Sequence, residues 1–358
     1  MERIGLVGLP NSGKSSLFNA LTGGAAVVAA HPFSTTETSV GVAHVPDQRL
    51  DALAAMSSSR KVVRAGVELV DIAGLVAGSS AGEGLGNRFL GGIREADAIC
   101  LVLRAFEDQS VPGSSDALED LGVLELELVL ADLSSAESQL ERRRKAAKQD
   151  RSLEGQLATL EKARDLLADG TPLYRARLPA EEREQLRAFF MLTNKPVLAV
   201  VNVGEASAGA DAGLTGPVAE ALGGAAEVLG VSVALEAEAA QLGPGDRAEL
   251  MEGLGLGEGA LPRVAQAAYR CLGRRTFLTT GDKESRAWTF RAGARAPECA
   301  GVIHSDLQRG FIRAEVVHWD ELLALGSWAA AREAGKLRVE GKDYEVADGD
   351  VLEIRFNV

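Results

Sequence analysis

The chain has 358 residues, of which 46% are apolar and 25% are charged. This length accommodates about two or three domains, and the composition is typical of folded globular proteins. Disordered, collagen-like and purely coiled-coil chains are therefore excluded. Acidic residues outnumber basic ones by 51 to 38, giving a net charge of −13. This charge argues against nonspecific binding to nucleic acids or anionic membranes.

The cysteines and the N-terminus point to a cytoplasmic protein. Cys100, Cys271 and Cys299 are widely spaced and form no C-x-x-C motif, so a disulfide framework or a zinc site is not expected. The sequence has no apolar run of 18 residues, which predicts no membrane span. The first residues, MERIGLVGLP, enter a predicted strand directly and show no signal-peptide pattern.

The first informative motif lies between a short apolar strand, 4–7, and a segment with helical apolar spacing. Residues 8–15, GLPNSGKS, match G-x-x-x-x-G-K-[ST] in this strand–loop–helix context. Gly8 and Gly13 allow the backbone N–H groups to curl around phosphate oxygens, and the following helix directs its positive end at the same anion. Lys14 supplies charge to the β- and γ-phosphates, and the Ser15 hydroxyl is a ligand for Mg²⁺.

A second phosphate-side element follows the apolar strand in VELVDIAG, residues 67–74. Asp71 is expected to hold Mg²⁺ through its water shell, and the Gly74 N–H is expected to contact the γ-phosphate. A switch NTPase also needs a threonine that completes the Mg²⁺ shell only when the γ-phosphate is present. Thr35 and Thr36 in HPFSTTETSVG both qualify by residue type, and spacing alone leaves the choice open.

Two segments are candidates for recognition of the base. Residues 193–196, TNKP, contain the Asn-Lys pair of the guanine motif N-K-x-D, but they precede an apolar strand, and Val197 stands in place of the Asp. We interpret them as a loop entering that strand. Asn202-Val203-Gly204-Glu205 lies at the carboxyl end of the same strand, where ligands bind in open α/β sheets. A second base-side loop is expected at Ser232, after the apolar stretch 228–231.

The base segment predicts altered specificity. In N-K-x-D the aspartate accepts hydrogen bonds from guanine N1–H and N2–H₂, whereas adenine has no donor at either position. Val203 and Glu205 replace the Lys and the Asp, so the usual guanine clamp is absent. Discrimination by polar pairing is steep, and its loss favours binding of adenine nucleotides.

Five segments together resemble the YchF/Obg-like ATPase family, a group of translation-factor-class P-loop NTPases. They are GLVGLPNSGKSSLFNALT, HPFSTTETSVGVAHVPDQRLDALA, DIAGLVAGSSAGEGLGNRFL, NVGE, and the C-terminal GKDYEVADGDVLEIRFNV. The resemblance extends over essentially the whole chain. It implies ATP as the preferred nucleotide, with N-x-x-E replacing N-K-x-D, and it implies ribosome association and a role in translation or stress responses.

The resemblance also assigns site residues. It implies that the triphosphate is bound by Asn11, Ser12, Gly13, Lys14, Ser15 and Ser16. It selects Thr35, with Ser15, as the Mg²⁺ ligand, and it places Asn202, Val203 and Glu205 around the base. Lys14, Thr35 and Gly74 are the residues expected to act in hydrolysis.

The chain departs from the family pattern at a few positions. Ser12, Ser16 and His31 are mild changes, whereas Ala77 replaces a typical Lys and removes a charge from the switch loop. In Ras-like switches the residue after the glycine at this position is a glutamine that positions water, whereas here it is Leu75. The resemblance places the family in the group of NTPases that carry a hydrophobic residue in place of this glutamine.

The middle of the chain, 115–190, interrupts the strand–helix alternation. Two leucine series share spacings of 4, 3 and 7 residues and predict an antiparallel coiled-coil hairpin; they are Leu126, Leu130, Leu133 and Leu140, and Leu153, Leu157, Leu160 and Leu167. Near the bend, the segment Arg142–Arg151 is strongly basic. This tip is either a solvated helix surface or a face for ribosomal RNA on an otherwise acidic protein.

The last segment, 276–358, reads as strands around a short helix near 297–304, with turn signals at Gly341-Lys342 and Asp348-Gly349. A small β-grasp fold with ubiquitin-like proportions fits this pattern. The resemblance identifies it as a TGS domain, an interaction module that is also a candidate for RNA contact. The expected domains are thus a P-loop domain at 1–114 and 191–275, a helical insertion at 115–190 and a TGS domain at 276–358.

The predicted fold class is therefore α/β: a P-loop NTPase with a mostly parallel sheet and helices on both faces, an inserted coiled-coil hairpin and a C-terminal β-grasp domain. The predicted function is a slow, Mg²⁺-dependent ATPase switch that docks on the large ribosomal subunit or the 70S particle and has no membrane partner. Asn11 adds K⁺ as a second candidate cation, because its side-chain oxygen can share the ion with phosphate oxygens. An Obg-like GTPase in ribosome assembly, with GTP as the nucleotide, and a nucleotide-gated scaffold with incidental hydrolysis are the alternatives.

Overall fold

The computed structural model describes residues 2–24, 27–29, 38–72, 85–108, 112–147 and 154–357. Two compact units account for these residues. The first contains residues 1–43 and 68–268, and the second contains residues 44–67 and 269–358. Residues 44–67 thus group with the C-terminal part of the chain, whereas the boundaries expected from the sequence keep them in the nucleotide-binding domain.

The first unit is built on a seven-stranded sheet of order β2-β3-β5-β1-β6-β7-β8. Strands β5, β1, β6, β7 and β8 are parallel, and β2 pairs with β3 in the antiparallel direction. The central β6 and β7 are almost continuously apolar because helices bury both of their faces. The strands are β1 (Arg3–Val7), β2 (Val27–Ala29), β3 (Thr38–His44), β5 (Gly66–Asp71), β6 (Ala98–Ala105), β7 (Val197–Val203) and β8 (Ala226–Val231).

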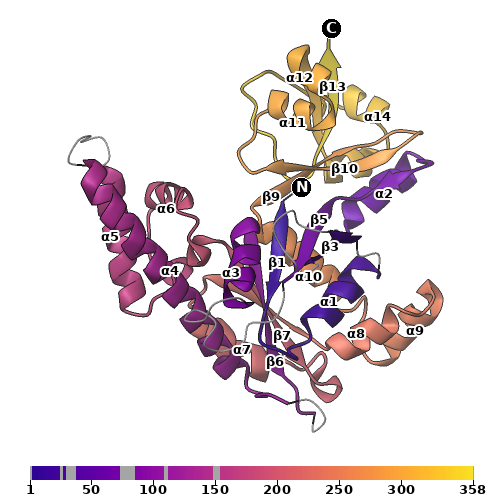
Figure 1. Ribbon diagram of the computed structural model, residues 1–358. Coiled ribbons are helices and arrows are strands. Elements are labelled where there is room, and N and C mark those ends of the chain that lie inside the picture. The colour runs from indigo at the N-terminus through magenta and orange to yellow at the C-terminus, as the bar shows by residue number, and fades with distance from the viewer. Residues whose placement is uncertain are drawn as a thin grey trace. The chain divides into compact units, whose positions relative to one another are not determined.

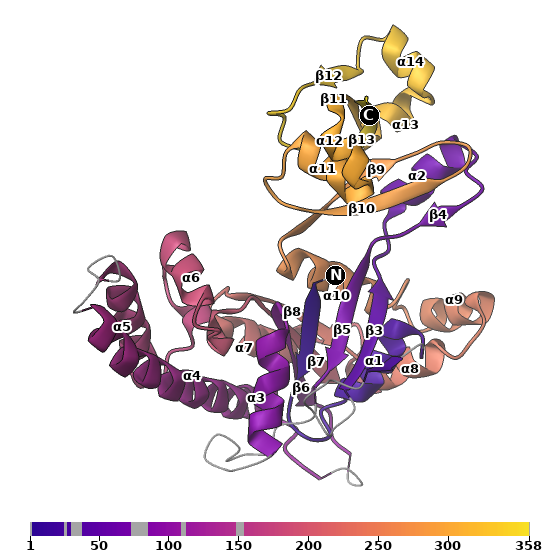
Figure 2. The same cartoon turned by 45° about the horizontal axis from the view of Figure 1, so that its top comes forward.

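Helices lie on both faces of this sheet, as expected for the fold class. Figure 2 shows α3, α4 and α7 on one side and α1 and α8 on the other. The first group shares one apolar core with the strands, and α1 packs against α8. The helices are α1 (Lys14–Thr22), α3 (Leu85–Glu95), α7 (Ala212–Leu222), α8 (Val233–Ala239), α9 (Pro244–Gly253) and α10 (Leu261–Cys271).

A helical hairpin extends from the sheet and carries its own core (Figure 1). The 31-residue α4 (Ala117–Ala147) packs against α5 (Glu154–Ala168), and α6 (Ala180–Arg187) follows. The first half of α4 contributes to the core of the sheet, and its second half contributes to the core of the hairpin. Short 3₁₀ turns, η3 (Leu173–Arg175) and η4 (Leu192–Asn194), lead back to β7.

The predicted leucine face of the hairpin is right for the described part of α5 and partly wrong for α4, and Leu153 lies outside the described residues. Leu160 and Leu167 are fully buried, whereas Leu126 and Leu130 are 57% and 42% exposed. Of the other predicted leucines of α4, Leu140 is buried in the hairpin core and Leu133 packs against it, whereas Leu124 and Leu128 fill the inward positions near the sheet. A series of leucines therefore does not define the buried face of a helix whose core switches from a sheet to another helix.

The second unit holds a six-stranded mixed sheet of order β12-β11-β13-β9-β10-β4. Helices α11 and α12 cover the core residues on one face. Its C-terminal elements are β9 (Arg274–Thr279), β10 (Ser285–Arg291), α11 (Ala296–Ile303), α12 (Ser305–Arg309), β11 (Phe311–His318), α13 (Trp319–Leu325), α14 (Trp328–Glu333), β12 (Arg338–Glu340) and β13 (Asp350–Phe356). Two further elements come from the early chain, α2 (Gln48–Met56) and β4 (Val62–Val63).

Within the described ranges, no helix has the length and apolar character needed to cross a bilayer.

Candidate nucleotide-binding site

The loop between β1 and α1 has the backbone conformation of an anion cradle. Asn11 and Gly13 adopt positive φ angles of 63° and 94°. A Cβ atom on Gly8 would collide with the Val102 carbonyl oxygen, and one on Gly13 would collide with the side chain of Asn202. Both glycines are thus required by close approach of the backbone to its neighbours, and Lys14 begins α1 directly behind them.

Lys14 lies folded over this loop. Its Nζ donates to the carbonyl oxygens of Gly8 at 3.0 Å and Leu9 at 2.9 Å. Burial lowers the pKa of Lys14, and the negative charges of Asp71 and Asp120 oppose that shift. The ammonium group therefore occupies a partly desolvated position, in which an added anion gains more electrostatic energy than it would in water.

Ser15, in the first turn of α1, contacts Asp71, the last residue of β5. The Ser15 hydroxyl donates to Asp71 Oδ2 at 2.6 Å. Hydroxyl and carboxylate oxygens suit Mg²⁺, which is usually held by one or two protein groups together with substrate phosphates. Among the described residues, no cluster of three or more His, Cys, Asp or Glu side chains offers a metal site made of protein alone. The pair fits an ion that arrives with a nucleotide.

Asn202, near the carboxyl end of β7, joins two loops. Its Nδ2 donates to the Ser12 carbonyl oxygen at 2.9 Å, and its Oδ1 accepts from the Val233 N–H at 3.2 Å. The side chain is only 4% exposed. Asn202 thus holds the phosphate loop against the loop after β8, where Ser232 lies. The Ser12 and Ser232 hydroxyls are both buried and have no hydrogen-bond partner within the described structure.

The other residues of the predicted base segment lie differently. The Val203 side chain packs into the core of the sheet, so only its backbone is available to a base. Glu205 is exposed and begins the 3₁₀ turn η5 (Glu205–Ser207). Val203 and Ser232 also line a cavity of about 260 Å³ with Glu236, Ala260 and Arg263.

Two family models match the two ends of the chain, and known proteins match its full length. A family model described as "50S ribosome-binding GTPase" matches residues 3–131, and a C-terminal YchF GTPase model, described as a protein of unknown function, matches residues 275–357. The "Ribosome-binding ATPase YchF" of Bacillus subtilis is 44% identical over 362 residues, covering 99% of each chain. The chain belongs to the YchF family.

Other YchF proteins agree with this assignment. The "Ribosome-binding ATPase YchF" of Mycoplasma genitalium is 39% identical over 372 residues and is covered completely, as is this chain. The solved "Structure of the Schizosaccharomyces pombe YchF GTPase" has a TM-score of 0.85 at 30% identity and covers 99% of this chain and 97% of its own. The predicted fold class, a P-loop NTPase with a characteristic C-terminal domain, is confirmed.

Within this YchF fold, three residues near the site were not predicted from the sequence. Phe106, which follows β6, lies beside Gly204 of the base segment, and the Arg104 guanidinium stacks over its ring at 4.5 Å. Asp120 on α4 accepts from the Arg104 N–H at 3.0 Å and contributes to the field at Lys14. The available signal was the position of Phe106 at the carboxyl end of an apolar strand.

The Asn-Lys pair of TNKP serves packing within the YchF fold. Asn194 Nδ2 donates to the Arg183 carbonyl oxygen, and Lys195 Nζ donates to the carbonyl oxygens of Arg94 and Ala96. Leu192 and Thr193 are bound to the buried Asp132 carboxylate. These contacts agree with the interpretation of 193–196 as a loop entering β7.

The predicted switch residues lie outside the described residues. They are His31, Thr35, Thr36, Gly74, Leu75 and Ala77.

Proposed function

We propose that this chain is a slow, Mg²⁺-dependent ATPase that binds the ribosome in the cytoplasm and regulates translation or its stress response. The observation that carries the proposal is the Asn202 clamp, which joins an intact phosphate loop to a base segment without the guanine-specific Lys and Asp. The names of the bacterial relatives, "Ribosome-binding ATPase YchF", support ATP and the ribosome as partners.

The phosphate site supports hydrolysis at the β–γ phosphoanhydride. A bound Mg²⁺ would neutralise charge on the phosphates, with Ser15, Asp71 and Thr35 as the residues assigned to it. Lys14 exchanges its two backbone acceptors for phosphate oxygens, so a charge already placed in the loop stabilises the transferred group. In this proposal Asn11 to Ser16 are assigned to the triphosphate and the Gly74 N–H to the γ-phosphate.

The expected rate is low because Leu75 cannot orient the attacking water. We expect turnover of roughly 10⁻⁴–10⁻² s⁻¹ without a partner, as in unassisted switch NTPases. The Asn11 Nδ2 donates to the Pro112 carbonyl oxygen at 3.3 Å, and we assign the amide oxygen of Asn11 to K⁺. Hydrolysis assays in matched K⁺ and Na⁺ buffers test this assignment, and equal rates would contradict it.

The decisive experiment compares the dissociation constants of ATP and GTP, using fluorescent analogues with unlabelled competition in Mg²⁺ and K⁺. The proposal expects at least tenfold tighter binding of ATP, about 1.4 kcal/mol. Glu205→Asp restores half of the guanine clamp and is expected to shift the ratio toward GTP. Val203→Lys is unsuitable as a companion, because Val203 is only 3% exposed and a lysine there would be forced into the core.

A guanine-nucleotide switch is the second candidate. The Schizosaccharomyces pombe relative is named a YchF GTPase, and the N-terminal family model is described as a ribosome-binding GTPase, so both favour this candidate. Tenfold tighter binding of GTP in the same titration would establish it and reject the adenine argument.

The hairpin end and the TGS domain are the proposed contacts with ribosomal RNA. Of the described basic residues at the tip, Arg144 pairs with Glu161 and Lys145 with Glu141, and Arg143 stacks over Phe189. The acidic partners reduce the net charge, although the Arg144 and Lys145 side chains remain 54% and 77% exposed. Charge reversal at Arg142 and Arg144 is expected to weaken co-sedimentation with ribosomes, and unchanged binding would reject this face.

A further inference from the structure

One segment of the nucleotide-binding chain is built into the C-terminal unit. The chain leaves the first unit after Ala43 and returns at Glu68, and the intervening residues 44–67, here called the excursion, belong to the second unit. On one side the excursion follows β3 and the segment that contains Thr35. On the other side it continues into β5, which ends at Asp71. Both of its ends therefore lead directly to segments assigned to nucleotide sensing.

The excursion is an integral part of the second unit. Leu50 and Leu53 on α2 are fully buried, and α2 packs against α13 and β10. Strand β4 extends the sheet in parallel with β10, with the Ser285 N–H donating to the Lys61 carbonyl oxygen at 2.9 Å. Burial of this kind, combined with sheet pairing, makes the excursion and residues 269–358 one packed body.

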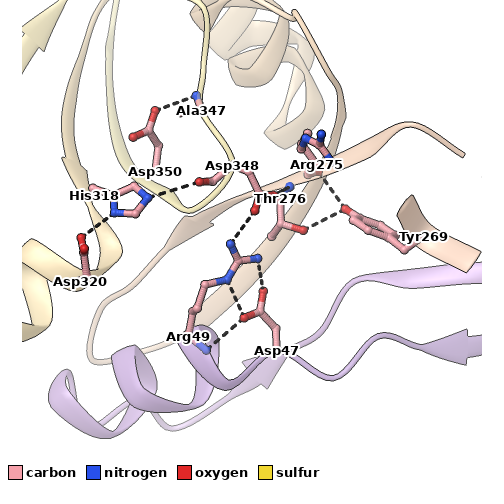
Figure 3. A network of polar contacts seen from close by, with 10 residues as sticks. All are labelled: Asp47, Arg49, Tyr269, Arg275, Thr276, His318, Asp320, Ala347, Asp348 and Asp350. Carbon is pink, nitrogen blue, oxygen red and sulfur yellow. Dashed lines mark hydrogen bonds and ion pairs between the residues drawn. The ribbon is translucent and has the colours of Figure 1, made fainter. Parts of the chain in front are cut away.

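A charged network fixes the start of α2 (Figure 3). The Arg49 guanidinium donates to Asp47 at 2.9 and 2.8 Å and to Asp348 Oδ2 at 2.7 Å. Asp348 Oδ1 in turn accepts from the Thr276 N–H at 2.8 Å. Arg49 thus links α2 to β9 and to the turn before β13, and its side chain is only 24% exposed.

A hydroxyl cluster fixes the end of α2. The Ser59 hydroxyl bonds with the Gly281 carbonyl oxygen and with the Ser285 hydroxyl, each at 2.7 Å. Thr280 Oγ1 lies 2.8 Å from Ser57 Oγ and 3.1 Å from the Leu53 carbonyl oxygen. With Arg49, this cluster holds the excursion at both ends of its helix.

We propose that the excursion couples the nucleotide state to the C-terminal domain, so that ATP and a partner of this domain change each other's affinity by the same factor. The inference rests on the proposed function, because it requires that the segments around Thr35 and Asp71 respond to the γ-phosphate. Packed side chains, hydrogen-bond networks and rigid secondary-structure elements carry coupling between distant sites. The excursion provides such elements. Two covalent connections join it to the first unit, and its helix α2 and strand β4 pack within the second.

The test loosens or locks the excursion without touching the nucleotide site. Arg49→Met with Ser59→Ala removes the link to Asp348 and the bonds to Gly281 and Ser285. Ser59→Cys with Ser285→Cys locks the contact, since the two hydroxyl oxygens are 2.7 Å apart and a disulfide bridges side chains at this range. Asp343→Asn is the matched control, because it breaks an exposed ion pair with Arg295 in the same domain but leaves the excursion intact.

The readout is hydrogen exchange of the full-length chain with ADP and with a non-hydrolysable ATP analogue plus Mg²⁺. In the wild type, the control and the oxidised double cysteine variant, exchange in residues 280–287 is expected to differ about fivefold or more between the two nucleotides. In the loosened variant that difference disappears, while residues 44–67 still respond. All three tryptophans lie in the C-terminal part, so their fluorescence verifies that this domain remains folded.

Nucleotide affinity, measured on the same samples, separates the two proposals. Failure of the wild type to bind the ATP analogue would contradict the proposed function. Normal binding with identical exchange in residues 280–287 for both nucleotides would overturn the coupling alone. A loosened variant that responds like the wild type would also overturn it.

Discussion

Ser15 and Asp71 are 56 residues apart in sequence, yet the Ser15 hydroxyl donates a 2.6 Å hydrogen bond to Asp71 Oδ2. The contact exists because β1 and β5 are neighbouring parallel strands, with Leu6 level with Asp71. The loop after one strand and the end of the next then share one edge of the sheet. The hydrogen bond marks the place where a phosphate-bound Mg²⁺ would find both oxygens.

Asp71→Asn is expected to weaken Mg²⁺-dependent ATP binding by about 10–100-fold, the usual effect of losing a residue that orients a metal's ligands. Titration of Mg²⁺ in the presence of a fluorescent ATP analogue measures this effect, with EDTA as the baseline. Asp165→Asn changes an exposed carboxylate of the hairpin and serves as the control. An unchanged Mg²⁺ dependence in Asp71→Asn would remove this residue from the metal site.

Asn202→Ala is expected to weaken ATP and GTP binding alike, by about tenfold or more. The substitution leaves the buried Val233 N–H and Ser12 carbonyl oxygen without their partner, and each such loss costs about 1–3 kcal/mol. The loops that it joins then lose their fixed spacing. Asn194→Ala, in the other Asn-containing segment, is the matched control and should bind nucleotides normally. If both variants bind equally well, the clamp has no role in nucleotide binding.

The local motifs were predictable because they depend on short-range chemistry. The phosphate loop, the apolar β7 and the strand–turn pattern of the C-terminal domain each follow from residue types within about 20 positions. The carboxyl-edge rule then brings Asp71 and Asn202 to the same site from sequence alone.

The long-range packing was not predictable in the same way. The excursion is amphipathic whichever domain it packs against, so the burial of Leu50 and Leu53 does not reveal its partner in advance. Val203 illustrates a second limit: the sequence shows that it stands in place of the motif Lys, but not that strand alternation directs its side chain into the core. Such features depend on tertiary contacts that no local pattern encodes.

Asp132→Ala is expected to destabilise the junction between the hairpin and β7. The Asp132 carboxylate is 1% exposed and accepts from the Leu192 N–H, the Thr193 N–H and the Thr193 hydroxyl at 2.7–2.8 Å. Burial raises its pKa, and these three donors oppose the shift. Truncation leaves all three donors without a partner, which is expected to lower the free energy of unfolding by about 2–4 kcal/mol.

Hydrogen exchange of residues 185–200 measures this loss locally. Exchange there should accelerate in Asp132→Ala and remain at the wild-type rate in Glu137→Ala, an exposed position on the same helix. Equal protection in both variants would show that the junction does not depend on the carboxylate.

Glu315 is expected to make the C-terminal unit sensitive to acid. Its carboxylate lies 3.0 Å from Arg332 and 3.3 Å from Arg355, and the hydrogen bond from Arg355, followed by that from Arg332, lowers its pKa. The folded state then favours the ionised form of Glu315. Between the lowered pKa and the ordinary glutamate pKa, the unfolded chain therefore binds more protons than the folded chain. This contribution to stability is complete above the ordinary glutamate pKa of about 4.3 and is lost as the pH falls toward the lowered value.

Urea unfolding between pH 6 and pH 3, followed by tryptophan fluorescence, measures this dependence, because Trp288, Trp319 and Trp328 all report on the C-terminal unit. Glu315→Gln should be less stable than the wild type at pH 6, and the difference should shrink as the pH falls. Glu333→Gln, an exposed change on α14, should follow the wild-type curve throughout. A constant difference between Glu315→Gln and the wild type would mean that packing, rather than the charge of Glu315, stabilises this side of the sheet.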